Sequence, residues 1–221
     1  MRTNVLRTIC FGLAALIALP GLAAVPGLAA DFSVEAADAA PSEGVPAAVA
    51  ALLQPDGVRV KDPAGKVVAE LWGRKAAFEG NPSSGFGIRF DNIPEGALIG
   101  LIRFPENGSD YREQNIPAGL YTLRYGLHPE NGDHMGVAPS RDFVLLTPAA
   151  ADMEASKNYG FDDMVDLSYK VGNSHPTVMR AALPDGDGGQ HIWQDDLEQW
   201  VVDLKVAGDA VGIIVYGHSE E

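Results

Sequence analysis

The chain has 221 residues, enough for one domain or two, and carries 16 basic and 30 acidic residues for a net charge of −14. This acid surplus repels phosphate backbones and argues against nucleic acid as a partner. The only cysteine, Cys10, lies in an apolar N-terminal stretch. The rest of the chain therefore has no thiol for a disulfide, a Cys-ligated zinc or an iron–sulfur cluster.

The first 30 residues have the layout of a secretory signal peptide. Arg2 and Arg7 form a positive start, residues 8 to 19 are apolar, and small residues lead to a cleavage position after Ala30. A retained membrane anchor is the alternative, because no charge follows Arg7 within this stretch. Cleavage would leave a net charge of −16. The sequence predicts an exported protein, periplasmic or extracellular, with no stable membrane insertion after signal removal.

The next stretch changes from irregular to regular structure. Residues 31 to 44 are rich in Ala, Glu and Ser, which predicts a flexible leader. A short helix is predicted over residues 46 to 54, since Pro46 suits a helix start. The hydrophobic pattern then changes to the period of two that strands show, and residues 58 to 72 predict a hairpin that turns at Gly65.

Further short strands follow, interrupted by one helix over residues 161 to 171, where apolar residues have helical spacing and Gly172 suits the C′ position. The predicted strands are residues 86–90, 97–104, 119–128, 142–147, 177–183, 200–206 and 210–217. This pattern predicts a mainly β fold, an antiparallel β-sandwich or jelly roll of about eight or nine strands, in a single domain over residues 45 to 221. Its inner faces would include Phe86, Tyr121 and Trp200.

Two polar loops of similar sequence form the main candidate binding site. Pro-Glu-Asn-Gly follows the predicted strand at 97–104, and the same four residues follow the strand at 119–128. If residues 111 to 116 crossed back as a strand, both loops would emerge at one end of the domain, where such folds carry binding sites. Two ordinary Asn-Gly turns are the alternative. The candidate binding residues are Glu106, Asp110, Glu130 and Asp133.

The candidate metal ligands are His128, Asp133 and His134. Imidazole and carboxylate suit zinc or manganese, and three protein ligands leave one position open for catalysis. Adjacent Asp133 and His134 would need a bent loop to point the same way, so surface histidines are the simpler interpretation. Residues 185 to 187, read Asp-Gly-Asp, resemble the start of a calcium loop but lack the later ligands. No cofactor is predicted, and a divalent metal (Zn, Mn or Ca) is left open.

Signals for catalysis are weak. The chain has no GxSxG nucleophile elbow, and Ser174 beside His175 is not the arrangement in which a nucleophile meets its base. Thirty acids guarantee chance carboxylate pairs, so no glycosidase pair stands out. Trp72 and Trp193 could stack on sugar rings, but partial burial explains both. No catalytic residue is predicted.

Three segments carry a resemblance to known proteins. They read IPEGALIGLIRFP at residues 93 to 105, YREQNIPAGLYTLRYGLHPENGDHMG at 111 to 136, and RDFVLLTPAAAD at 141 to 152. They resemble a family of uncharacterised exported bacterial β-sandwich proteins. The resemblance implies no established activity, so no site residue is carried over from it.

Together these features predict an exported, non-catalytic binding or envelope-associated domain that acts through the loops at 105–116 and 128–140. The partner would be a small molecule, a glycan or an envelope protein. The alternative is a metal-dependent hydrolase that uses His128, Asp133 and His134. A structural envelope component without a small-molecule site is the third hypothesis.

Overall fold

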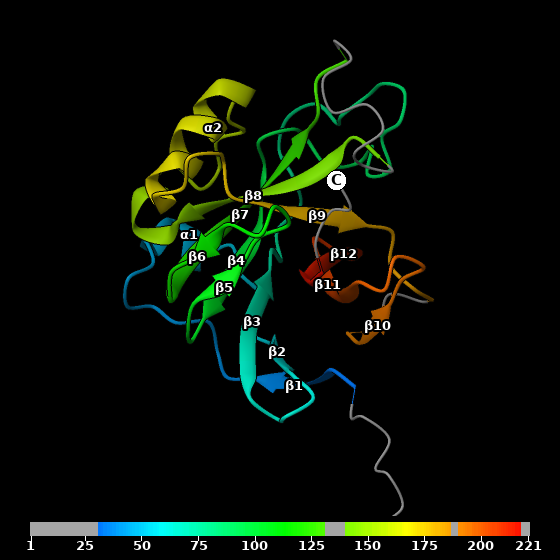
Figure 1. Ribbon diagram of the computed structural model, residues 1–221. Helices are drawn as coiled ribbons and strands as arrows, with labels where there is room; N and C mark the ends of the chain where they lie inside the picture. The colour runs from blue at the N-terminus through cyan, green and yellow to red at the C-terminus, as the bar shows by residue number, and fades with distance from the viewer. Residues whose placement is uncertain (1–30, 131–139, 187–189, 218–221) are drawn as a thin grey trace, which may run out of the picture.

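The computed structural model describes residues 31–130, 140–186 and 190–217, and its main feature is one ten-stranded antiparallel sheet (Figure 1). The strands, in chain order, are β1 (Ser33–Ala37), β2 (Gly57–Lys61), β3 (Val67–Gly73), β4 (Leu98–Phe104), β7 (Gly119–Leu127), β8 (Asp142–Pro148), β9 (Val178–Ala182), β10 (Ile192–Gln194), β11 (Trp200–Val206) and β12 (Asp209–Tyr216). Their order across the sheet is β1-β2-β3-β4-β7-β8-β9-β12-β11-β10.

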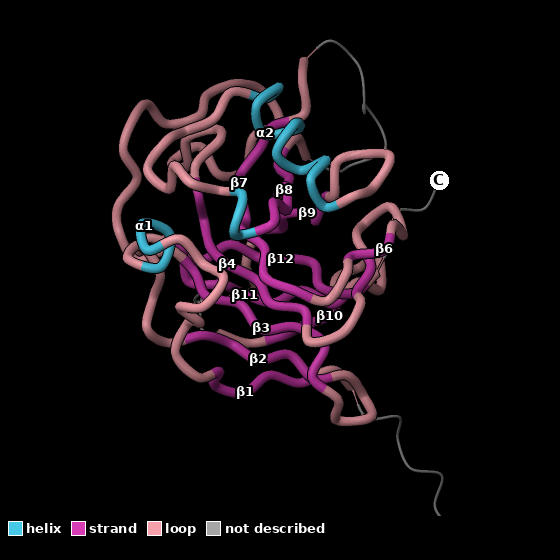
Figure 2. Tube along the Cα trace, turned by 90° about the vertical axis from the view of Figure 1, so that its left-hand side faces the viewer, coloured by secondary structure: helices cyan, strands magenta, loops and turns pink. Residues whose placement is uncertain are grey.

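The remaining elements lie in the connections. A small hairpin, β5 (Gly108–Ser109) and β6 (Asn115–Ile116), joins β4 to β7. The helices are α1 (Ala47–Ala50), α2 (Phe161–Ser168) and the 3-10 turns η1 (Ala149–Ala151) and η2 (Tyr169–Val171). Figure 2 shows α1 and α2 on the outside of the curved sheet. Among the described residues, no helix is long and apolar enough to cross a membrane.

The sheet curls around a single hydrophobic core. Strands on both sides of the molecule contribute inward-facing residues to the same cluster, as the alternation of each strand requires. Fully buried examples, one from each of eight strands, are Val60, Leu71, Ile102, Leu123, Val144, Ala181, Val202 and Ile213. One continuous sheet therefore supplies all the inner faces, and its shape approaches a barrel.

The curled sheet closes where the end of β3 meets the end of β11. The Ala207 N–H donates to the Arg74 carbonyl at 2.6 Å. At Gly73 the two backbones approach so closely that an added Cβ would lie 1.9 Å from the Lys205 carbonyl oxygen. We call this junction the β3–β11 seam.

Several predicted elements are confirmed. The hairpin over 58–72 is β2 and β3, and the apolar run at 97–104 is β4, which is buried on both faces except at Arg103. The predicted helix is α2 continued by η2, and Gly172 follows it with a left-handed φ of 106°. Glycine is well suited there because a side chain would crowd the backbone.

The predicted sandwich or jelly roll of eight or nine strands is not confirmed. The strand period shows which residues face inward, but one curled sheet and two stacked sheets give the same alternation. The flexible leader is also wrong for part of its length, because Ser33–Ala37 forms β1 and pairs with β2. Phe32 is buried there, and its ring centroid lies 5.3 Å from that of Trp200 and 4.9 Å from that of Tyr216. The predicted signal peptide lies outside the described residues.

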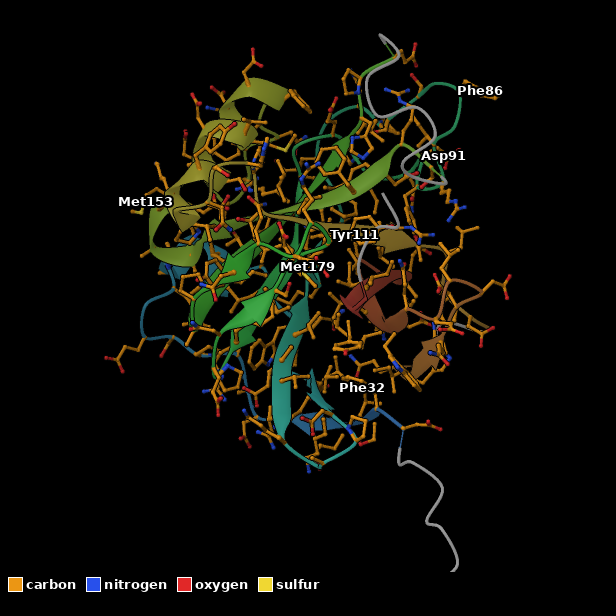
Figure 3. The ribbon with its side chains drawn as sticks, viewed as in Figure 1. Phe32, Phe86, Asp91, Tyr111, Met153 and Met179 are labelled. Carbon is orange, nitrogen blue, oxygen red and sulfur yellow. The ribbon has the colours of Figure 1, made fainter. Side chains whose placement is uncertain are left out.

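The strand predicted at 86–90 is absent: this segment is a turn-rich loop in the structure. Gly85 and Gly87 adopt positive φ angles of 143° and 76°, which a strand does not allow. Phe86 was predicted in the core, but it is 94% exposed and projects away from the body of the molecule (Figure 3). Phe90 is buried and Ile88 is half-buried against the same core, so among these apolar residues only Phe86 was misplaced.

We expect Gly73→Ala to lower the free energy of unfolding by about 1–3 kcal/mol, because the new methyl group would force the β3–β11 seam apart. Urea unfolding measures the change. Gly119→Ala is the matched control, since a Cβ there meets only ordinary contacts at 3.6 Å with Tyr121. Equal losses in the two variants would contradict the tight approach at the seam.

Candidate functional site

The two predicted loops lie at opposite ends of the sheet. β4 and β7 are antiparallel neighbours, with Phe104 opposite Gly119 and Leu98 opposite Arg124. The loop after β4 is therefore at the start of β7, and the loop after β7 is at its other end. The hypothesis of one shared end is wrong, because the chain between β4 and β7 only forms the β5–β6 hairpin and does not recross the sheet.

The two acids of the first loop have structural partners. Glu106 is exposed and its carboxylate lies 2.6 Å from Lys66 Nζ. Asp110 is buried, and its carboxylate accepts hydrogen bonds from the backbone N–H groups of Arg112, Gln114 and Val178. Asp110 thus attaches this loop to β9.

The second loop is described only as far as Glu130. The His128 ring packs on Phe143, with 4.6 Å between the ring centroids. Arg141 donates to the His128 carbonyl at 2.7 Å and to Glu130 Oε1 at 2.5 Å. Asp133, predicted both as a binding acid and as a metal ligand, and the predicted ligand His134 lie outside the described residues. The metal site therefore stays a prediction. The described part of the chain contains no group of three or more His, Cys, Asp or Glu residues able to hold a metal.

A different site is built around a buried charge on β7. Arg124 is fully buried on the outer face of this strand. Its Nε and Nη2 donate to the two carboxylate oxygens of Asp152 at 2.9 and 2.6 Å. The remaining N–H groups donate to the carbonyls of Gly96, Glu154 and Lys157 at 2.5 to 3.1 Å. Every guanidinium N–H is therefore used, as a buried arginine requires.

These bonds fix the segment of residues 152 to 159 against the sheet. The Tyr159 ring centroid lies 4.5 Å from the Arg124 guanidinium carbon and 4.6 Å from Lys157 Nζ, both within cation–π distance. Gly96, with a φ of 79°, lets the segment approach, since a Cβ there would lie 1.9 Å from the Tyr159 carbonyl oxygen. Burial raises the pKa of the Tyr159 hydroxyl, and the nearby Asp152 carboxylate adds to this rise.

A pocket of about 330 Å³ lies between this segment and α2. Its apolar lining comes from Met153, Tyr159 and Leu167. Met153 is 66% exposed and lies on the outer side of the molecule beside α2 (Figure 3). Tyr159 and Leu167 are buried and join the apolar contacts beneath the helix. The pocket thus combines a fixed apolar floor with an open rim.

Charged side chains of both signs line the same pocket. They are Glu154, Lys157, Asp163, Asp166 and Lys170. Lys157 Nζ lies 3.4 Å from the Glu154 carboxylate and 3.8 Å from that of Asp163, so it bridges the segment and the helix. Chemically, the pocket offers carboxylates to a cation, ammonium groups to an anion and an apolar floor to a hydrocarbon group.

None of the predicted site residues that the structure describes lines this pocket. The period of β7 places Arg124 on the face opposite the core residues Leu123 and Tyr125, and no function was predicted for it. One signal could have been used: its described neighbours on that face, Leu120, Thr122 and Gly126, carry no charge. A single charge on an otherwise uncharged strand face indicates a covered face with a partnered charge.

No protein-family model, curated protein or solved structure matches the chain. The resemblance to exported bacterial proteins therefore stays a prediction, and the pocket has to be interpreted from its own chemistry.

We expect Arg124→Met to lower the free energy of unfolding by about 3–5 kcal/mol, because the Asp152 carboxylate would stay buried without its cation. Hydrogen exchange of the amides from residue 154 to 159 should accelerate as their anchor is lost. Lys66→Met, which removes an exposed ion pair with Glu106, should leave stability almost unchanged. Similar losses in both variants would show that Arg124 is not an anchor.

Proposed function

We propose that this protein is an exported, non-catalytic β-domain that binds a small molecule in the pocket between residues 151–159 and α2. The ligand would be a zwitterion with an apolar group, such as an apolar amino acid or a short peptide. The observation that carries the proposal is the pocket itself, whose 330 Å³ hold an apolar floor and charges of both signs. Its volume lies at the small end of the range for small-molecule sites, ~300–1,000 Å³.

The chemistry of the lining supports this ligand class. An apolar group would pack on Tyr159 and Leu167, where burial of each CH₂ contributes about 0.8 kcal/mol. A ligand ammonium group would be attracted by the carboxylates of α2, and a ligand carboxylate by Lys157 or Lys170. A molecule with only one of these groups would leave part of the lining unmatched.

The rigidity of the pocket also favours binding. Four of the five hydrogen bonds of Arg124 hold residues 152 to 157 before any ligand arrives. A preformed site needs little ordering on binding, so more of the contact energy is expressed as affinity. Export is supported by the signal-like N-terminus of the sequence.

Ligand-observed NMR with leucine and three analogues tests the proposal. Leucinamide lacks the carboxylate, isocaproate lacks the ammonium group, and glycine lacks the apolar group. We expect leucine or the dipeptide Gly-Leu to bind more tightly than any of the three, because only they match all parts of the pocket lining.

Two variants of η1 locate the binding. Ala151 lines the pocket, so Ala151→Phe should fill it and abolish the signal. Ala150→Phe adds the same group at the exposed neighbouring position and should leave binding unchanged. Binding that survives in both variants would place the ligand elsewhere, and no binding by leucine or Gly-Leu would remove the support for this ligand class.

A further inference from the structure

A second buried charge lies on β11, outside the pocket. Asp203 is in the middle of this strand, and its side chain is fully buried. Its neighbours Val202 and Leu204 face the inner core, so Asp203 lies on the outer face. An ionised carboxylate in such a position needs donors close by.

Three groups approach Asp203, two from the connection between β9 and β10 and one from β10 itself. The Trp193 Nε1–H donates to Oδ1 at 3.0 Å, and the backbone N–H of Asp185 donates to Oδ2 at 3.1 Å. His191 Nδ1 lies 3.3 Å from the same Oδ2. Asp203 therefore contacts the start of this connection through Asp185 and its end through His191. It also contacts β10 through Trp193.

His191 lies between two carboxylates. Its Nδ1 is next to Asp203, and its Nε2 lies 3.7 Å from Asp185 Oδ2. The His191 side chain is 40% exposed, so it can exchange protons with solvent. A neutral imidazole has one N–H and serves only one carboxylate as a donor, whereas the protonated ring has two and serves both.

We propose that His191 is a pH-dependent clasp that, when protonated, pairs with Asp185 and Asp203 together and ties the β9–β10 connection to β11. This inference is independent of the proposed ligand pocket. It rests on the position of the imidazole between one buried and one exposed carboxylate.

The surroundings determine the sign of the pH effect. Among the described residues, one carboxylate from β11 and one from the connection lie beside the ring, while β10 contributes the uncharged Trp193. Trp193 in turn packs on apolar residues of β9, β11 and β12. The next residue on the same face of β11, Lys205, is exposed. The carboxylates nearest the ring therefore favour its protonated form.

Burial also raises the pKa of the Asp203 carboxyl, while its bond from Trp193 and the charge of His191 act in the opposite direction. Ionised Asp203 thus costs stability above its own folded pKa, and protonated His191 offsets that cost. A histidine with a raised folded pKa contributes stability below its unfolded pKa and loses it as the pH rises through the folded value. The clasp is strongest between the pKa of Asp203 and that of His191.

An NMR titration of the purified protein in EDTA, which keeps metal ions away, tests the clasp directly. We expect the His191 imidazole to titrate with a midpoint above the ordinary histidine value of about 6.5, and the Trp193 indole N–H signal to move at the same midpoint. Asp185→Asn keeps the size of the side chain but removes its charge, so it should lower the His191 midpoint. A midpoint at or below 6.5, or one unchanged by Asp185→Asn, would overturn the proposal.

Urea unfolding at pH 6 and pH 8 gives an independent measurement. The wild-type protein should lose stability over this interval relative to His191→Gln, by up to tenfold in the unfolding equilibrium constant for each unit by which the His191 pKa is raised. Glutamine can still donate to Asp203, so the variant is expected to fold. His175→Gln, which removes an exposed histidine elsewhere, should behave like the wild type. If the two variants respond alike, His191 is not the clasp.

Discussion

The outer side of this sheet depends on the buried ion pair between Arg124 and Asp152. A buried charge without a partner is among the most costly features that a protein can contain. Here hydrogen bonds offset that cost, because all five guanidinium N–H groups have acceptors. Three of these acceptors are backbone carbonyls, which come from two different segments. Arg124 can make all five hydrogen bonds only when these segments lie as they do here. The ion pair with Asp152 therefore fixes the position of the chain after β8.

At three other places a buried carboxylate accepts hydrogen bonds from a loop. Asp110 accepts backbone N–H groups of its own loop and of β9, and Asp142 accepts those of Arg89 and Phe90 together with the Tyr125 hydroxyl. Asp203 does so for the β9–β10 connection. Each buried carboxylate attaches a loop to the sheet: Asp203 does so on the outer face, and Asp142 on the inner face that it shares with the core residue Val144. A curled sheet has its main core inside, so the loops on its outside rely on these polar contacts as well as on small apolar clusters.

The inward-facing core residues of the strands could be predicted from the sequence. Tyr121, Leu123 and Tyr125 alternate as a strand requires and lie in the core, and the run at 97–104 is apolar on both faces because both are covered. The curvature of the sheet could not be predicted, because the side-chain period is the same in a barrel-like sheet and in a sandwich. Alternation also failed at Phe86, where two glycines with positive φ turn the chain out of register.

The candidate site was not predicted for a related reason. Its residues come from segments that carry no motif, and they meet only because Arg124 holds one of them in place. The acids at the start of α2 also favour the helix dipole, so their presence alone does not indicate a binding site. The loops that did show a motif, with Glu106 and Glu130, lie at opposite ends of β7. Sequence similarity between loops gives no information on strand direction.

The β3–β11 seam has a consequence for the order in which the protein can form. It joins Arg74 to Ala207, residues from opposite halves of the chain, whereas the pairs β2–β3, β7–β8 and β11–β12 join strands that are consecutive or close in sequence. Closing such a distant contact carries a larger entropy cost than pairing consecutive strands, and it cannot occur until β11 has been synthesised. A chain still emerging from the ribosome can therefore pair β3 with β2 and β4, but it cannot close the sheet into its curled form until Ala207 has been added.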